Sequence, residues 1–98
     1  MAEFDLNALD EVIHGKLRLG LMAFLSGVDH ASFAELKAQT GASDGNLSVH
    51  LRKLEEAGYV LVEKSFIGRK PHTTAKLTAE GRKAWIDYLD QLKRLLGP

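Results

Sequence analysis

Polar side chains that could contact a nucleic acid are concentrated between residues 43 and 53. The apolar residues of this segment, Leu47, Leu51 and Leu54, fall on one narrow stripe of a helix that turns about 100° per residue. Phosphate oxygens need hydrogen-bond donors, and base edges need short polar side chains. The other sides of the helix supply both, through Asn46, Ser48, His50, Arg52 and Lys53. The pattern therefore predicts a helix that contacts the major groove of DNA, where a protonated His50 could pair with a phosphate.

Two residues at the start of this segment favour the same chemistry. Ser43 is a typical helix-capping residue, and the free amide groups beside it could hold a phosphate. Gly45 has no side chain, so the backbone could approach a partner closely there.

A second candidate contact region is the run from Lys64 to Lys76, which carries four bases and no acid. Residues 59–66 are rich in β-branched and aromatic types and predict a strand, and residues 72–77 can return as its partner. Gly68 marks the turn, and Pro71 argues against a central strand at that point. Arg69 and Lys70 would then lie at the tip of a hairpin. They could contact a phosphate backbone there, and the alternative is that the tip is an ordinary solvated turn.

The overall composition fits one soluble domain of 98 residues, with 45% hydrophobic and 27% charged residues. Thirteen basic and thirteen acidic side chains give a net charge of zero, which by itself speaks against a nucleic-acid partner. The charge is unevenly distributed, however, because residues 1–31 carry five acids and two bases. The neutral sum thus combines an acidic N-terminal region with a basic hairpin.

Several classes of function are disfavoured by what the chain lacks. The absence of cysteine excludes disulfides, thiolate zinc sites and a cysteine nucleophile. The four histidines, His14, His30, His50 and His72, have no metal-site spacing, and no catalytic motif occurs, so we expect no metal, cofactor or enzyme activity. No apolar stretch is long enough to span a membrane, and the acidic start differs from a signal peptide. A cytoplasmic protein without a membrane partner is expected.

The elements that must position these residues can be predicted from periodicity and capping signals. Ser32 and Glu35 form a capping box for a short helix that ends at Gly41, and Thr78 caps a last helix over residues 79–96. Residues 5–28 are predicted to be a long helix, although Gly15 leaves a break near His14 as an alternative. That helix is predicted from apolar residues at steps of three or four: Leu6, Leu9, Ile13, Leu17, Leu21 and Phe24.

The order of these elements predicts the fold class. Two short helices around a glycine-containing turn form a helix-turn-helix over residues 32–58, and the hairpin over residues 59–78 adds a wing. The expected fold is mainly α with a small β-hairpin wing, a winged helix-turn-helix in one domain over residues 1–98. The helices at both termini, residues 5–28 and 79–96, are expected to form a dimer interface.

The chain resembles small winged helix-turn-helix transcriptional regulators of the MarR and ArsR superfamily, and most closely a compact bacterial group. Residues 44–60 are similar to the recognition helix of that group and the entry into its wing, residues 64–73 to its wing, and residues 77–82 to the start of its last helix. The resemblance implies sequence-specific binding of double-stranded DNA by a homodimer that regulates transcription, as a repressor. A small-molecule effector is not indicated by the sequence. The cysteine ligands usual in ArsR-like metal sensors are missing.

The resemblance also implies roles for individual residues. Those that match the recognition helix and the wing are Asn46, Ser48, Val49, His50, Arg52, Lys53, Arg69, Lys70 and His72. Dimer contacts in such proteins come from the first and last helices, which here carry Leu6, Leu9, Ile13, Trp85, Tyr88, Leu92 and Leu95. The alternative is a winged-helix module used only for protein–protein interaction, since a fold alone does not exclude that use.

Overall fold

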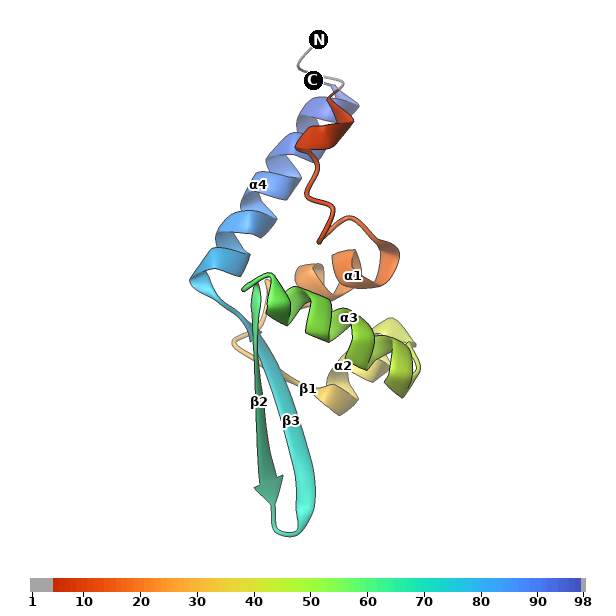
Figure 1. Cartoon of the computed structure of the whole chain (residues 1–98), viewed down its shortest axis with the longest axis vertical. Helices are drawn as coiled ribbons and strands as arrows, with labels where there is room; N and C mark the ends of the chain where they lie inside the picture. The colour runs from red at the N-terminus through yellow and green to blue at the C-terminus, as the bar shows by residue number, and fades with distance from the viewer. Residues whose placement is uncertain (1–4, 98) are drawn as a thin grey trace.

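The computed structural model describes residues 5–97 of the chain. The elements, in order, are η2 (Leu6–Ala8), α1 (Lys16–Leu25), β1 (Ala31–Ser32), α2 (Phe33–Thr40), α3 (Asp44–Glu56), β2 (Val60–Ile67), β3 (Lys70–Leu77) and α4 (Ala79–Leu96). Figure 1 shows α1, α2 and α3 gathered in a helical body, with the β2–β3 hairpin extending from one end and α4 extending toward the other. The predicted winged-helix architecture, mainly α with a hairpin wing, is confirmed.

Residues 5–28 do not form the predicted long helix, and the alternative, a break near His14 at Gly15, is what the structure shows. The chain makes only the short η2, a turn over residues 11–13, and then α1 from Lys16 to Leu25. The carboxylate of Asp10 accepts hydrogen bonds from the amides of Val12 and Ile13, at 2.8 and 3.4 Å, and so competes with helical pairing. Gly15 has extended backbone angles, and α1 begins after it. The apolar spacing was correct, but local side-chain bonding and the glycine interrupt the helix.

The helix-turn-helix begins and ends where the capping signals predicted. The Ser32 hydroxyl accepts from the Glu35 amide and the Glu35 carboxylate accepts from the Ser32 amide, which completes the capping box. Gly41 follows α2 with φ of 70°, a left-handed conformation that favours glycine and turns the chain into α3. The Ser43 hydroxyl then accepts from the Asn46 amide at 3.2 Å, so the start of α3 is fixed by residues on the turn itself.

The sheet contains three antiparallel strands in the order β1-β3-β2, one more than the hairpin that the sequence predicted. β1 is only two residues long and pairs Ala31 with Ala75 and Ser32 with Thr74. The hairpin runs from the Val60–Leu77 pair to the Ile67–Lys70 pair, so β3 includes Pro71. Pro71 lies beyond the end of β1, where β3 has β2 as its neighbour, and its missing amide therefore interrupts no pairing with β1.

Helix α4 begins where Thr78 caps it and packs tightly against the link between α3 and β2. The Thr78 hydroxyl accepts from the Gly81 amide at 2.9 Å and donates to the Gly58 carbonyl oxygen at 2.6 Å. Gly81 is buried, and a β-carbon at this position would overlap the carbonyl group of Tyr59. A glycine is therefore required for α4 to approach the link between α3 and β2.

One apolar core joins the body to both projections. Its largest fully buried side chains come from every helix of the body, from the turn before α1 and from α4: Ile13, Leu21, Met22, Leu25, Leu36, Leu47, Leu54 and Tyr88. Tyr59 fixes the N-terminal turn to this core, because its hydroxyl donates to the Asp10 carboxylate. That hydrogen bond, with burial, raises the pKa of Tyr59 to about 12. Among residues 5–97, no helix is both long and apolar enough to cross a membrane.

Candidate nucleic-acid interface

Helix α3 presents the outward face that the sequence predicted. Leu47, Leu51 and Leu54 are buried beneath it, and Val49 on the opposite side is 51% exposed. Most of the candidate contact residues are exposed as well, namely Ser43, Gly45, Asn46, Ser48, Arg52 and Lys53. His50 alone in this set is half-buried. The helix thus offers one continuous polar face of a size that a DNA major groove, about 12 Å wide, admits.

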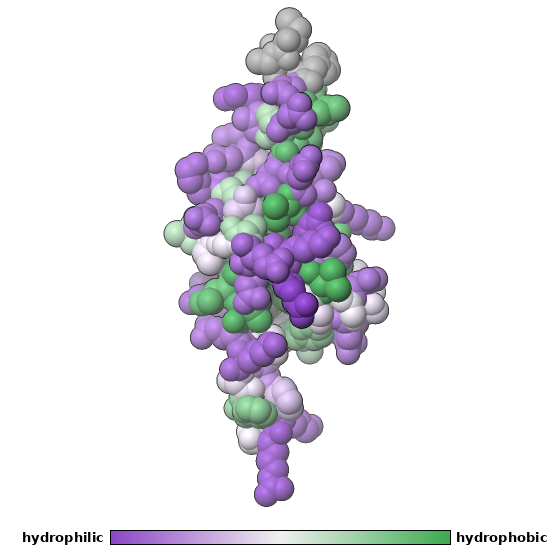
Figure 2. Space-filling view, viewed as in Figure 1, coloured by the Kyte–Doolittle hydropathy of each residue, from purple (hydrophilic) through white to green (hydrophobic). Residues whose placement is uncertain are grey.

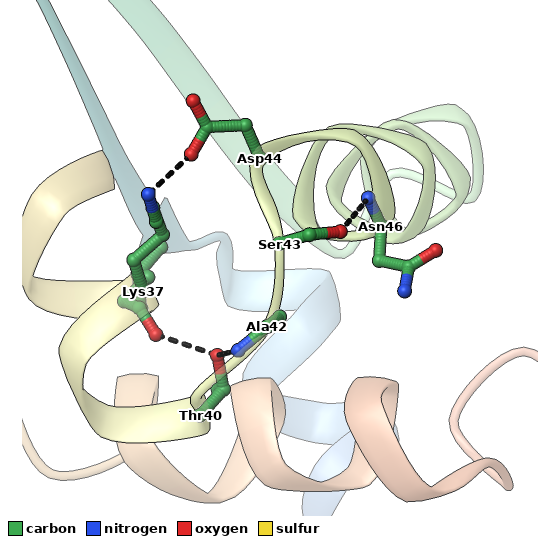
Figure 3. A network of polar contacts seen from close by, with 7 residues as sticks. Lys37, Thr40, Ala42, Ser43, Asp44 and Asn46 are labelled. Atoms are coloured by element: carbon green, nitrogen blue, oxygen red, sulfur yellow. Dashed lines mark hydrogen bonds and ion pairs between the residues drawn. The ribbon is translucent and has the colours of Figure 1, made fainter.

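An ion pair across the turn between α2 and α3 offsets the charge of an acidic residue near this face (Figure 3). Lys37 on α2 forms an ion pair of 2.6 Å with Asp44, the first residue of α3. Both side chains are well exposed, so the pair adds little to stability, but it offsets a negative charge where phosphates would approach. Figure 3 also shows the side-chain amide of Asn46 pointing away from the turn, while its backbone amide donates a hydrogen bond to the Ser43 hydroxyl.

His50 is held by Arg18 of α1, which the sequence did not indicate as part of the site. The Arg18 guanidinium donates from Nη1 to Nδ1 of His50 at 2.8 Å and from Nε to the Val12 carbonyl oxygen. Because arginine has no acceptor, Nδ1 of His50 must be unprotonated and the ring neutral. Burial, and then the charges of Arg18 and Lys53, lower the pKa of His50 below its ordinary value. This environment opposes the protonated His50 considered as a phosphate partner.

A groove of about 300 Å³ lies between α3 and the wing. Its rim carries a base from each side, Arg52 of α3 and Lys64 of β2, together with one acid, Glu55. The remaining lining residues are Phe33, Ser48, Leu51, Val62 and Thr73. Lys64 was noted in the basic run but not as a contact residue, although its even spacing from the inward-facing Val62 indicates the same face of the strand.

The wing divides its candidate residues between two faces. Successive residues of a strand alternate sides, and directly paired residues share a side. Lys64 and its partner Thr73 therefore face α3, which agrees with their place in the groove, whereas His72 and its partner Ser65 face the opposite side. Arg69 and Lys70 are exposed at the tip of the hairpin. The structure thus brings Lys64 to the side of α3 and does not bring His72 there.

Two of the predicted dimer residues are corrected by the structure. Ile13 is fully buried and Tyr88 is 2% exposed within the single chain, so neither offers surface to a second copy. Tyr88 instead packs inward, stacked on Trp85 with ring centroids 5.9 Å apart and hydrogen-bonded through its hydroxyl to His14 at 2.8 Å. Leu6 is 68% exposed, and Leu9, Trp85, Leu92 and Leu95 are partly exposed.

The residues on this surface of α3 and the wing are of types that bind a partner. The surface combines donors, positive charge and apolar floor residues along α3 and the wing. Within the described residues, His, Cys, Asp and Glu form no group of three or more that could hold a metal ion.

The comparisons with known proteins agree with this geometry. A family model described as a winged helix DNA-binding domain matches residues 17–96, which run from the second residue of α1 to the end of α4. That family is a class of DNA-binding domains of transcriptional regulators rather than a class of enzymes. The resemblance to MarR- and ArsR-like regulators is confirmed.

Individual relatives include archaeal proteins, so the group is not restricted to bacteria. An uncharacterized protein of Methanocaldococcus jannaschii is 35% identical over 85 residues, which are 87% of this chain and 92% of that protein. The structure of a transcriptional regulator homologue from Pyrococcus horikoshii OT3 is similar with a TM-score of 0.83 and 30% identity, over 89% of this chain and 86% of that one. A possible transcriptional regulator for arsenical resistance is similar with a TM-score of 0.63 and 28% identity, over 93% and 91%. The chain belongs to the winged helix DNA-binding domain family.

Proposed function

We propose that the protein binds double-stranded DNA in a sequence-specific manner and regulates transcription as a homodimer. The observation that carries the proposal is the juxtaposition of α3 and the wing. The exposed polar face of α3 continues into a groove whose two sides each present a base, Arg52 and Lys64. A module used only for protein–protein contact has no need of this arrangement of positive charge.

In the proposed complex, α3 enters the major groove and the wing lies over the adjacent backbone and minor groove. Asn46 and Ser48 have short side chains that can exchange hydrogen bonds with base edges, and both are exposed. Arg52 and Lys64 would hold the sugar-phosphate backbone that separates the two grooves, and Arg69 and Lys70 would meet phosphates beyond it. Gly45 and the exposed Val49 allow the helix to approach the bases closely.

The dimer is proposed from the apolar surface of α4 and the N-terminal segment. Ile86, Leu89 and Leu96 of α4 are 54%, 42% and 78% exposed, and at helical spacing they lie beside the half-buried Trp85 and Leu92. Figure 2 shows apolar side chains gathered at the end of the molecule where η2 and the end of α4 lie. A patch of this kind is typical of an interaction surface. Helix-turn-helix dimers bind half-sites about one helical turn of DNA apart, and we expect two copies paired there to present their α3 helices in this way.

Repression is the regulatory role that we propose, since a dimer bound across a promoter excludes other proteins from it. The cytoplasmic location expected from the sequence is part of this proposal, because the DNA target must be accessible.

The test is selection of bound duplexes from a random-sequence pool by the purified protein, followed by sequencing and affinity measurement at several salt concentrations. We expect an enriched, partly palindromic site and an affinity that falls by orders of magnitude between about 50 and 200 mM salt. Absence of binding to any duplex at low salt would overturn the proposal and favour the protein–protein module.

A further inference from the structure

The distal half of the wing carries an exposed aromatic side chain in basic surroundings. Phe66 in β2 is 71% exposed, although a phenylalanine ring is usually buried. The bases Lys64, Arg69 and Lys70 lie within four residues of it along the chain, and the segment from Lys64 to Lys76 has no acid. Figure 2 shows an apolar patch on the wing among hydrophilic side chains. The wing therefore combines an apolar group with a positive field.

The pairing register determines which way this ring faces. Phe66 pairs with Pro71, and it is an even number of residues from Val62 and Lys64, which line the groove against α3. Alternation along the strand therefore puts Phe66 and Pro71 on the α3 side of the wing. Ile67, which is 64% exposed, is the next residue and faces the opposite side.

The spacing along β2 places Phe66 well beyond the groove that faces α3. Phe66 lies four residues beyond Val62, about 13 Å along the strand at the usual rise. A partner that touches both α3 and Phe66 must therefore fill the groove between Arg52 and Lys64 and continue past it. In DNA, a negatively charged backbone separates the major groove from a minor groove about 6 Å wide. The bases on the rim of the protein groove complement that backbone in charge.

Resting on the proposed function, we propose that Phe66, supported by Pro71, inserts into the minor groove next to the major groove that α3 occupies. Apolar side chains commonly enter the minor groove, where they contact sugars and base edges and can open a base step. Guanine adds an amino group to the floor of that groove and adenine does not. Phe66 is thus a specificity-determining residue that favours A·T pairs beneath the wing.

The experiment compares two neighbouring substitutions on the selected duplex. Phe66→Ala removes the proposed contact, and Ile67→Ala is the matched control, since both residues are exposed and adjacent but face opposite sides. We expect F66A to raise the Kd by about tenfold and I67A by less than about threefold, measured by fluorescence anisotropy at constant salt. Thermal unfolding should be unchanged in both variants, because neither side chain is part of the core.

A modified duplex then tests the groove itself. Replacing adenine by 2,6-diaminopurine, one A·T pair at a time, adds an amino group to the minor groove and leaves the major-groove edge intact. At the pair beneath the wing, we expect a loss of about fivefold for the wild type and less than about twofold for F66A. Equal affinity of F66A and the wild type, equal losses in F66A and I67A, or independent effects of protein and base changes would each overturn the inference. The proposed function would survive those outcomes, whereas a wild type that selects no duplex would overturn both.

Discussion

Arg69 and Lys70 at the tip of the wing supply charge rather than base recognition in the proposed complex. Replacing both by alanine should weaken binding to all sequences to a similar extent and flatten the salt slope by up to about two units. The control is Lys93→Ala with Arg94→Ala on α4, which removes the same charge at the far end of the molecule. Affinity titrations at several salt concentrations provide the measurement. A larger effect of the α4 pair would argue against contact of the wing with DNA.

For Asn46 we expect an effect on base preference instead of a similar loss for all sequences, because its exposed side-chain amide can distinguish one base edge from another. Asn46→Ala should change base preference at one position of each half-site, at a cost of about 1–3 kcal/mol for the preferred base. The backbone amide that Ser43 caps is retained in this variant, so α3 should remain intact. Affinities for all four bases at each position of the selected site provide the test. A uniform loss across sequences would contradict a role in base recognition.

His50 should make stability depend on pH. The folded protein lowers the pKa of His50, mainly by burial and then through Arg18 and Lys53, so the unfolded chain binds the proton more readily. The contribution of His50 to the free energy of unfolding is therefore complete above about pH 6.5, and it is lost as the pH falls toward the lowered pKa of the folded state. His50→Asn keeps an acceptor for Arg18 but does not titrate, and it should reduce the loss of stability between about pH 7 and pH 5. Urea unfolding at both pH values measures this, and an unchanged pH dependence would refute it.

At the scale of the elements, the approach of α4 to the body depends on one buried glycine. Gly81→Ala would force a methyl group into the Tyr59 carbonyl, and we expect a loss of about 3 kcal/mol in the free energy of unfolding. Gly20→Ala is the matched control, since Gly20 is also inside a helix but has open space where the methyl group would lie. That change should stabilise the protein by up to about 1 kcal/mol. Chemical denaturation compares the two, and a similar effect of both would contradict the close packing of α4.

The helix ends could be predicted because their causes lie within a few residues. The capping box of Ser32 and Glu35, the Ser43 cap and the Thr78 cap each join groups three residues apart, and α4 spans the predicted residues 79–96. The break before α1 depends instead on whether the Asp10 carboxylate bonds to nearby amides, and Tyr59, far away in the sequence, helps to hold that carboxylate. Periodicity alone could not decide between those two states.

At the scale of the whole molecule, the proposed dimer rests on the apolar side of α4. Leu89→Glu should convert a dimer into a monomer, because it introduces a charge into the proposed interface. Leu61→Glu is the matched control, since Leu61 is 43% exposed against 42% for Leu89 but lies on β2. Sedimentation equilibrium of the wild type and both variants distinguishes the cases. A monomeric wild type, or dissociation by L61E as well, would contradict the assignment of α4.

The neutral net charge acquires a different meaning in three dimensions. Asp10 lines a pocket together with residues of α4, whereas Arg69 and Lys70 lie at the distant tip of the wing. The sum over the chain is therefore zero while the candidate interface is locally basic. We expect only modest non-specific attraction to DNA, so affinity must come from fit between α3, the wing and the two grooves.

The amino-acid sequence by itself determined the order of the elements, the caps of α2, α3 and α4, and the polar face of α3, because periodicity and capping are short-range properties. Only the tertiary structure decided that β1 adds a third strand, that Ile13 and Tyr88 are buried, and that Arg18 holds His50. It also decided which face of the wing meets α3 and thereby placed Lys64 on the same groove as Arg52. These features depend on contacts between residues far apart in the chain, which local spacing does not encode.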